Sequence, residues 1–236
     1  MLYYKFTPLL AAKERGDVIY SPYLLPLRRM NLQEGISMIQ QQASQTSIWE
    51  WIAVLTGIAE VLLARANKVL LYPAGIISVT ITIVLYAMGG LYAESFLNVY
   101  YLVMSIYGWV HWVRRKNEAP LPISHVTQKE WVIMAAIIVI GWTGMWLVLD
   151  AYTNSTVPGM DSWVSATGWA GMWLLARRKI ENWVVLNVSN LFAIPLLYSK
   201  GFMLYSALTL FLFIVAIFGY IEWRKLYKAQ RVGLSQ

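Results

Sequence analysis

Seven long apolar segments, separated by short breaks that are charged or contain glycine, constrain this chain more than any other feature. The segments span residues 47–64, 69–89, 92–113, 131–150, 157–176, 181–199 and 202–223. A helix needs about 20 apolar residues to cross the hydrocarbon core of a bilayer, and fewer where neighbouring helices shield its ends. In that core only helices and closed barrels satisfy their backbone hydrogen bonds. We therefore predict an all-α integral membrane protein with seven transmembrane helices.

The composition supports a membrane protein and excludes several kinds of function. Hydrophobic residues make up 58% of the chain and charged residues only 13%, which is too apolar for an ordinary soluble domain. The sequence has no cysteine and only two histidines, so neither a metal site nor a cofactor is expected. It also lacks the Gly-rich phosphate loop, HExxH and GxSxG motifs, so we expect neither catalytic residues nor an ATP-driven pump.

The basic residues predict how the chain is oriented. Those in the loops after the first, third and fifth segments, or in the C-terminal tail, are Arg65, Lys68, Arg114, Arg115, Lys116, Lys129, Arg177, Arg178, Lys179, Arg224, Lys225, Lys228 and Arg231. The opposite side holds Lys200 and five basic residues in the first 46 positions, which oppose this assignment. Because cytoplasmic loops are enriched in Lys and Arg, we expect a cytoplasmic C-terminus. Topology then accounts for the net charge of +7, and no nucleic-acid partner is expected.

The third and seventh segments resemble each other when the chain is shifted by 111 residues. The aligned pairs include Gly90 with Gly201, Ile106 with Ile217, Gly108 with Gly219, Trp112 with Trp223, Tyr72 with Trp183 and Ser78 with Ser189. We interpret this as two three-helix repeats joined by one linker helix, an arrangement that makes the repeats parallel. The alternative is that any two membrane helices share Gly and Trp near their ends.

The predicted organisation has five parts. They are a polar leader (1–46), a first three-helix repeat (47–113), a linker helix (131–150), a second three-helix repeat (157–225) and a cytoplasmic tail (226–236). Within the leader, residues 30–42 also fit a surface helix. Transporters with internal repeats bind their substrate between the halves, near the middle of the bilayer.

Polar and aromatic side chains form a stripe on each of two segments. At about 100° per residue, one face of the third segment carries Glu94, Asn98, Tyr101, Ser105, Trp109 and Trp112. One face of the sixth segment carries Trp183, Asn187 and Asn190. Amides are costly in a bilayer unless they meet a partner or a water-filled cavity, so the two stripes predict one shared pocket. Its ring and amides would suit a flat, polar ligand, and a cation would gain from the indole face. The alternative for Asn98, Tyr101, Asn187 and Asn190 is that they only join helices by hydrogen bonds.

Two acids in the apolar segments receive different interpretations. Glu60 is a candidate functional acid, with a local hydrogen bond to a hydroxyl group as the alternative. Glu181 is expected to pair with Arg177 or Arg178, which precede it by one helical turn.

Three tryptophans lie near the ends of their segments. Because tryptophan is enriched where a helix meets the bilayer surface, we interpret these residues as interface anchors rather than ligand contacts. They are Trp112, Trp131 and Trp223.

A longer pattern resembles a known family. The pattern NxxYxxxxxYGWxxW is present as Asn98, Tyr101, Tyr107, Gly108, Trp109 and Trp112. It resembles the signature of the PnuC family of bacterial vitamin transporters, and ARRKIENW, YSKGF and GYIEWRK resemble that family's C-terminal half. The resemblance covers about residues 48–225. It implies a fold similar to the SWEET sugar transporters and a place in the bacterial inner (plasma) membrane. It also implies facilitated diffusion of a vitamin that intracellular phosphorylation then traps.

The resemblance extends to the binding site. It implies that Trp183 and Asn190 contact the vitamin, while Asn98, Tyr101 and Trp109 match the family's motif. With the stripes and acids above, the predicted substrate-binding residues are Trp183, Asn187, Asn190, Asn98, Tyr101, Trp109, Glu60 and Glu94.

One departure from the family affects the expected substrate. Nicotinamide riboside transporters commonly show WxxW in the sixth segment, whereas here Leu186 takes the second position. Nicotinamide riboside is the first expectation, thiamine (the PnuT branch) is the alternative, and riboflavin is third. A homo-oligomer is compatible with the sequence.

Overall fold

The computed structural model describes residues 32–89, 92–113, 121–152 and 157–233, and for residues 32, 92–94 and 233 it describes only the backbone. Its helices are α3 (Leu32–Ser44), α4 (Ile48–Arg65), α5 (Leu71–Met88), α6 (Tyr92–Val113), α7 (Gln128–Tyr152), α8 (Pro158–Ala176), α9 (Asn182–Ser199) and α10 (Met203–Gly233). The predicted all-helical class is confirmed. The first 31 residues of the predicted leader, Gly90 and the basic run 114–116 lie outside the described residues.

Local sequence signals place the starts of three helices. At α4, the Ser47 hydroxyl accepts a hydrogen bond from the Glu50 backbone N–H (3.3 Å), and the Glu50 carboxylate accepts one from the Ser47 N–H (2.6 Å). Thr127 and Glu130 form the same reciprocal pair at α7. Such pairs satisfy backbone donors that lack a partner within the helix. Helix α8 begins at Pro158, whose fixed φ suits a first helical position.

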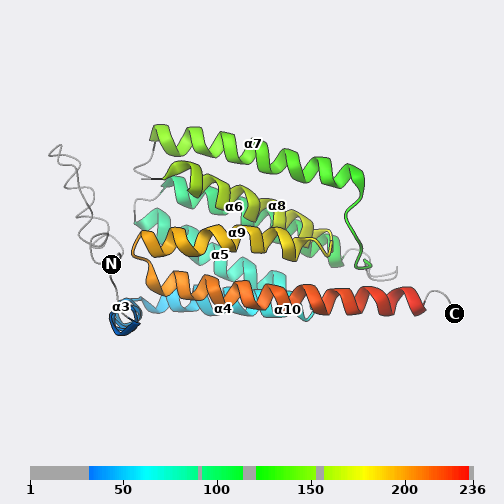
Figure 1. The fold of residues 1–236 in the computed structure, drawn as a ribbon, viewed down its shortest axis with the longest axis horizontal. Coiled ribbons are helices and arrows are strands. Elements are labelled where there is room, and N and C mark those ends of the chain that lie inside the picture. Colours follow the sequence, from blue (N-terminus) through cyan, green and yellow to red (C-terminus); the bar gives the residue numbers. More distant parts are fainter. Residues whose placement is uncertain (1–31, 90–91, 114–120, 153–156, 234–236) are drawn as a thin grey trace.

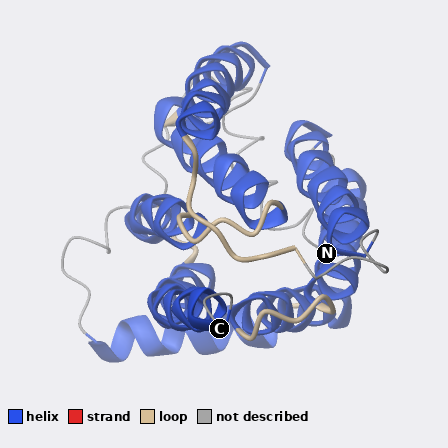
Figure 2. Cartoon of the chain, turned by 90° about the vertical axis from the view of Figure 1, so that its right-hand side faces the viewer, coloured by secondary structure: helices blue, strands red, loops and turns tan. Residues whose placement is uncertain are grey.

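The long helices form one bundle in which two groups of three can be distinguished. In unit 1, α5 packs against α4 and α6, and in unit 2, α9 packs against α8 and α10. The units meet where α6 contacts α8 and where α10 contacts α4, while α7 packs on the outside of α8. Figure 1 shows α4 to α10 side by side, with α3 across one end, and Figure 2 looks along the bundle from the other end.

Helix α3 is bent by 111° relative to α4 and is attached to unit 2. The Gln42 side-chain amide donates to the Gly201 carbonyl (2.7 Å) and accepts from the Leu204 backbone N–H (2.9 Å). Both partners lie at the turn between α9 and α10. The amide therefore holds α3 against that turn.

Length and apolar composition mark three described helices as membrane spans. They are α5, α7 and α10, and the bent pair α3–α4 would add a fourth. The other long helices carry polar groups that lower their apolar content: α4 contains Glu50, Glu60 and Arg65, for example. Helices α6 and α9 contain the predicted stripes, of which Asn98, Tyr101, Ser105, Trp183 and Asn190 face the interior of the bundle.

Two serine hydrogen bonds within unit 1 have counterparts within unit 2, 111 residues later in the chain. The same number of residues separates Asn67 from Arg178. The serine hydroxyl bonds are Ser78 to the Ala53 carbonyl (2.8 Å), Ser189 to the Val164 carbonyl (2.7 Å), Ser95 to the Ile83 carbonyl (3.0 Å) and Ser206 to the Ile194 carbonyl (3.0 Å). Asn67 and Arg178 also share the left-handed backbone conformation, with φ of 55° and 54°. The two units therefore have the same internal contacts at these positions.

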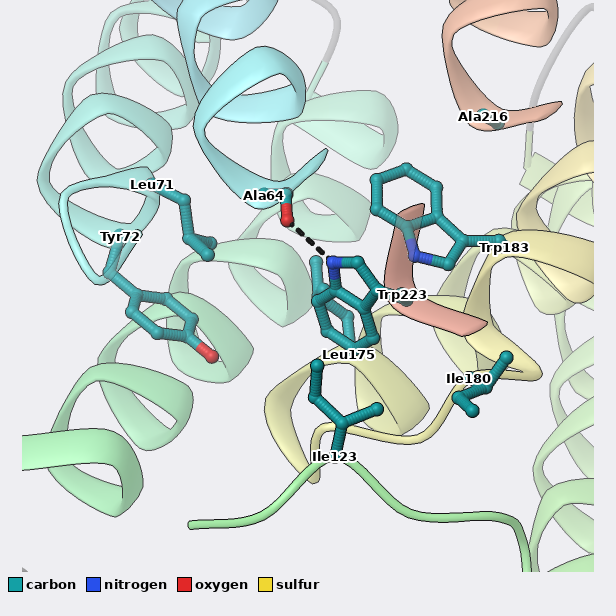
Figure 3. Close-up of a cluster of buried hydrophobic side chains, with 9 residues drawn as sticks. All are labelled: Ala64, Leu71, Tyr72, Ile123, Leu175, Ile180, Trp183, Ala216 and Trp223. Carbon is teal, nitrogen blue, oxygen red and sulfur yellow. Dashed lines mark hydrogen bonds between the residues drawn. The ribbon is translucent and has the colours of Figure 1, made fainter. Parts of the chain in front are cut away.

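Two tryptophans join the units reciprocally. The Trp112 indole of unit 1 donates to the Ala176 carbonyl in unit 2 (3.1 Å), and the Trp223 indole of unit 2 donates to the Ala64 carbonyl in unit 1 (2.9 Å; Figure 3). The carbonyls lie in the last turns of α8 and α4, where backbone acceptors lack partners within the helix. The prediction that Trp112 and Trp223 are interface anchors is therefore wrong, whereas Trp131 is exposed on α7.

The acid pairing predicted for Glu181 is also wrong. Its carboxylate binds the ring of His125 (2.7 Å) and the backbone N–H of Val126 (3.0 Å). Sequence spacing favours partners within one helix, but the chain turns between α8 and α9 and brings a distant segment to Glu181.

The neighbouring cations have other partners. The carboxylate of Glu130 pairs with Arg177 (3.0 Å) and Lys179 (2.9 Å), which ties α7 to the α8–α9 turn. The Arg178 guanidinium donates to the side chain of Asn67 and to the carbonyl of Leu121. Burial lowers the pKa of Arg178. This polar layer covers the end of the bundle where α4 and α8 finish.

Candidate functional site

A cavity of about 300 Å³ lies between the two units, at the small end of the usual range for ligand pockets. Its described lining residues are Glu60, Val61, Ala64, Gly75, Ser78, Val79, Thr82, Asn98, Tyr101, Ser105, Gly168, Met172, Leu175, Trp183, Leu186, Ser189, Asn190, Leu212 and Ala216. Six helices contribute to it, three from each unit. The cavity is thus placed where parallel repeats would put a substrate.

The structure brings five of the predicted site residues together in this cavity. Glu60 comes from α4, Asn98 and Tyr101 from α6, and Trp183 and Asn190 from α9. The polar faces of α6 and α9 therefore meet in one space, as the two stripes predict. The lining combines a carboxyl group, two amides, a phenol and an indole.

Three other predicted site residues do not line this cavity as described. Asn187 is half-buried and accepts a hydrogen bond from the Asn190 amide (3.4 Å). Trp109 is 41% exposed on the outside of α6. Glu94 lies in α6, and its side chain lies outside the described part of the structure.

Trp183 forms one end of the cavity. Only 2% of its surface is exposed, and its ring meets that of Trp223 edge-on at 5.7 Å. A Cβ atom at Gly219 would lie 2.7 Å from the Trp183 ring, so the glycine makes room for the indole. The Trp183 Nε1 atom has no hydrogen-bond partner among the described residues. The ring is thus fixed by packing, and its donor is unused.

Unit 1 contains the corresponding contacts. Tyr72 meets Trp112 edge-on at 5.2 Å, and Gly108 leaves room for the Tyr72 ring. Trp112 and Trp223 lie 6.4 Å apart between ring centroids, so the four rings form a continuous aromatic cluster of Tyr72, Trp112, Trp223 and Trp183. Figure 3 shows Tyr72, Trp183 and Trp223 of this cluster together with Ile123, which lies in the loop before α7 and belongs to the same hydrophobic core. The cluster closes the cavity at the end where α4 and α8 finish.

The Glu60 side chain occupies space that a glycine leaves open. A Cβ atom at Gly75 would lie 2.5 Å from the carboxyl carbon of Glu60. In unit 2 the residue that corresponds to Glu60 is Gly171, and the residue that corresponds to Gly75 is Leu186. There the glycine lies on the other helix of the pair and leaves room for the Leu186 side chain, which would lie 2.6 Å from a Cβ atom at Gly171. No hydrogen bond or ion pair joins Glu60 to another described residue, so the hydroxyl partner considered from the sequence is not found there. The carboxyl group therefore faces the cavity.

Sequence reasoning missed the polar face of α5. Gly75, Ser78, Val79 and Thr82 line the cavity at the spacing i, i+3, i+4 and i+7, which is one face of a helix. This spacing could have identified them, but two hydroxyls in an apolar segment resemble ordinary packing residues. Both hydroxyls donate to backbone carbonyls, at 2.8 Å for Ser78 and 2.9 Å for Thr82. Their hydrogens are therefore engaged within the protein.

The described residues hold no cluster of three or more His, Cys, Asp or Glu side chains arranged to bind a metal ion. The cavity chemistry is instead that of recognition. An indole and two amides can contact a flat, polar ligand, and a carboxylate can attract a cation.

Comparisons with known proteins agree on one family. A family model described as nicotinamide mononucleotide transporter matches residues 47–225. The chain is 23% identical over 200 residues to the nicotinamide riboside transporter PnuC of Escherichia coli (strain K12), an alignment that covers 74% of this chain and 84% of that protein. It is 25% identical over 192 residues to the nicotinamide riboside transporter PnuC of Neisseria mucosa, covering 75% of this chain and 72% of that protein.

A solved structure shares the fold. The crystal structure of the vitamin B3 transporter PnuC matches with a TM-score of 0.62 at 22% identity, covering 83% of this chain and 90% of that one.

Proposed function

Because this chain belongs to the PnuC family of nicotinamide mononucleotide transporters and is a multi-pass membrane protein, we propose that it carries a vitamin across the bacterial inner (plasma) membrane by facilitated diffusion. Nicotinamide riboside is the proposed substrate. The curated relatives from Escherichia coli and Neisseria mucosa are named for it. The observation that carries the proposal is the cavity between the units, where polar faces from both meet.

The proposed binding residues follow from the cavity lining. Trp183 and Tyr101 would contact the flat ring of the vitamin, while the amides of Asn98 and Asn190 exchange hydrogen bonds with its polar groups. Glu60 supplies negative charge. Asn187 would support the Asn190 amide. Trp109 and Glu94 remain predictions from the family pattern and the α6 stripe.

Thiamine is the second candidate because of a specific contact. Leu186 fills the space beside Gly171, at the position where nicotinamide riboside transporters commonly carry a second tryptophan. The cavity then offers one indole rather than two. Thiamine, like nicotinamide riboside, is a flat cation with a polar arm, so the remaining groups suit either vitamin. Riboflavin is neutral and larger, and we place it third.

The proposed architecture has seven membrane-spanning helices, α4 to α10, arranged as two parallel three-helix repeats with α7 as the linker. The serine bonds and glycine–ring contacts that recur at a separation of 111 residues support it. The basic residues of the α4–α5 and α8–α9 turns support a cytoplasmic position for the end closed by the aromatic cluster. The C-terminus would lie on that side.

The proposed mechanism is alternating access, in which units 1 and 2 rock against each other around the cavity. The two reciprocal tryptophan bonds hold the units together at the closed end, so opening this end requires both to break. Net uptake would follow the vitamin gradient, which intracellular phosphorylation maintains.

Uptake into proteoliposomes tests the proposal. We expect labelled nicotinamide riboside to equilibrate without an imposed proton or sodium gradient, and excess unlabelled vitamin to compete. Accumulation of unmodified vitamin that requires either ion gradient would contradict facilitated diffusion.

A further inference from the structure

The charges that line the cavity are unbalanced. Glu60 is the one acid among its described lining residues, and none of these residues is Lys, Arg or His. Basic side chains at the closed end have other partners: Arg65 lies over the Phe218 ring, Arg178 binds Asn67 and Leu121, and Lys179 binds Glu130. The cavity therefore offers a carboxyl group without a protein cation beside it.

The position of this carboxyl group is built into the helix pair. Because residue 75 is glycine, α5 leaves room for the Glu60 carboxyl group, which would otherwise lie 2.5 Å from a Cβ atom. In unit 2 the same place is filled by the apolar side chain of Leu186. The negative charge is thus confined to the unit 1 wall of the cavity, whereas Asn190 contributes an amide from unit 2.

A carboxylate in this environment favours a cationic partner. Charged groups within the membrane are costly unless they are paired, and opposite charges attract more strongly where water is excluded. A bound cation would satisfy Glu60 and also gain from the faces of the aromatic rings. A neutral compound of the same shape would leave the carboxyl group without a partner.

We infer that Glu60, positioned by Gly75, is the counter-ion that makes this site select a cation over a neutral molecule of the same shape. The inference rests on the proposed function and deepens it. It names the charge of the substrate and assigns the residue that recognises it. Gly75 is a positioning residue, since it acts through the location of the Glu60 carboxyl group.

The test compares matched cationic and neutral ligands by calorimetry on the purified full-length protein. The pairs are nicotinamide riboside with its neutral dihydro form, and thiamine with neutral 3-deazathiamine. The variants are Glu60→Gln, which removes the charge but keeps the shape, and Gly75→Ala, which keeps the charge but displaces it. Glu222→Gln on α10 makes the same chemical change outside the described cavity lining and serves as the control.

In the wild-type protein and the Glu222→Gln control, we expect the cation of at least one pair to bind about tenfold or more tightly than its neutral partner. In Glu60→Gln this ratio should fall to near one, mainly through weaker binding of the cation. Gly75→Ala should reduce the ratio in part, because the Glu60 side chain is flexible enough to move without unfolding the helix pair.

Two results would overturn the inference. A wild-type ratio that Glu60→Gln leaves unchanged would show that Glu60 does not sense charge, while the proposed function would stand. Wild-type protein that binds neither vitamin would overturn the proposed function itself, and the inference with it. Circular dichroism of each variant checks that the fold is kept.

Discussion

The two tryptophan bonds between the units set how easily the closed end of the cavity opens. Trp112 and Trp223 each donate to a carbonyl of the opposite unit, at 3.1 and 2.9 Å. Phenylalanine at either position keeps an aromatic ring but removes the N–H donor. We therefore predict that Trp112→Phe and Trp223→Phe each destabilise the closed end, and that the double variant destabilises it most.

The magnitude follows from the two bonds. Side-chain hydrogen bonds between membrane helices contribute about 0.6 kcal/mol on average, and a typical buried bond in a folded protein about 1 kcal/mol. Two bonds therefore contribute roughly 1.2 to 2 kcal/mol, which corresponds to a change of about eight- to thirtyfold in the population of the open end. The smaller ring adds to this effect, most at Trp223, which is fully buried.

The absence of native cysteine makes this opening measurable. Ser105 lines the cavity next to the aromatic cluster and is 1% exposed, so Ser105→Cys introduces a single, nearly isosteric thiol. The labelling rate of this thiol by a membrane-impermeant maleimide, added on the side of the C-terminus, reports how often the end opens. We expect the double phenylalanine variant to label about ten times faster than the parent.

Trp131→Phe is the matched control, because this tryptophan is exposed on α7 and makes no described contact between the units. It should leave the labelling rate unchanged. Equal rates for the double variant, the control and the parent would refute the argument that the tryptophan bonds hold this end closed.

Three further predictions concern the cavity and its surroundings. Asn190→Leu removes a cavity amide but no described bond between helices. It should weaken vitamin binding about tenfold in calorimetry, while the thermal unfolding temperature stays within a few degrees of the wild type. An equal loss of binding in Val184→Ala, a change at an exposed position, would contradict a specific role for Asn190. Trp183→Ala should lower the free energy of unfolding by about 3–5 kcal/mol, because the ring is almost completely buried. Trp183→Phe should keep the fold but bind the vitamin more weakly, which unfolding scans and calorimetry measure separately. A Trp183→Ala variant as stable as the wild type would disprove the packing argument. Glu130→Gln should lower the free energy of unfolding by about 2–4 kcal/mol, because Lys179 would stay buried without its acidic partner. If Glu130→Gln unfolds at the same temperature as Glu222→Gln, this contribution of the buried ion pair is refuted.

Much of the fold could be predicted because its signals are local. Each apolar segment before the last ends at a polar or glycine-containing break, and α4 to α9 follow their segments to within three residues. The last helix, α10, continues to Gly233, ten residues beyond the predicted segment, because the polar residues after Trp223 are compatible with a helix outside the apolar core. The spacing that aligns Gly108 with Gly219 also locates two glycines that make room for an aromatic ring. Any larger residue at Gly108 or Gly219 would place its Cβ atom too close to the ring, so glycine is needed at this position in both units.

Other features depend on contacts that span the whole chain. Helical periodicity places Trp109 on the polar stripe of α6. In the structure Ser105 and Gly108 are buried, whereas Trp109 is exposed. The buried face of α6 at this end of the helix therefore does not include Trp109. The partners of Trp112 and Trp223 lie in the opposite unit, so the position of these tryptophans near a helix end resembles that of interface anchors. Periodicity identifies a face of a helix, but not what that face meets.

Calorimetric binding of nicotinamide riboside and thiamine to the purified protein and to Asn190→Leu tests whether the cavity between the units is the substrate site. We predict saturable binding of nicotinamide riboside at one site per chain, weakened by Asn190→Leu. Tighter binding of thiamine would assign the substrate to the second candidate and make Leu186 the mark of that specificity. If neither vitamin binds, or if Asn190→Leu binds as well as the wild type, the cavity between the units is not the substrate site.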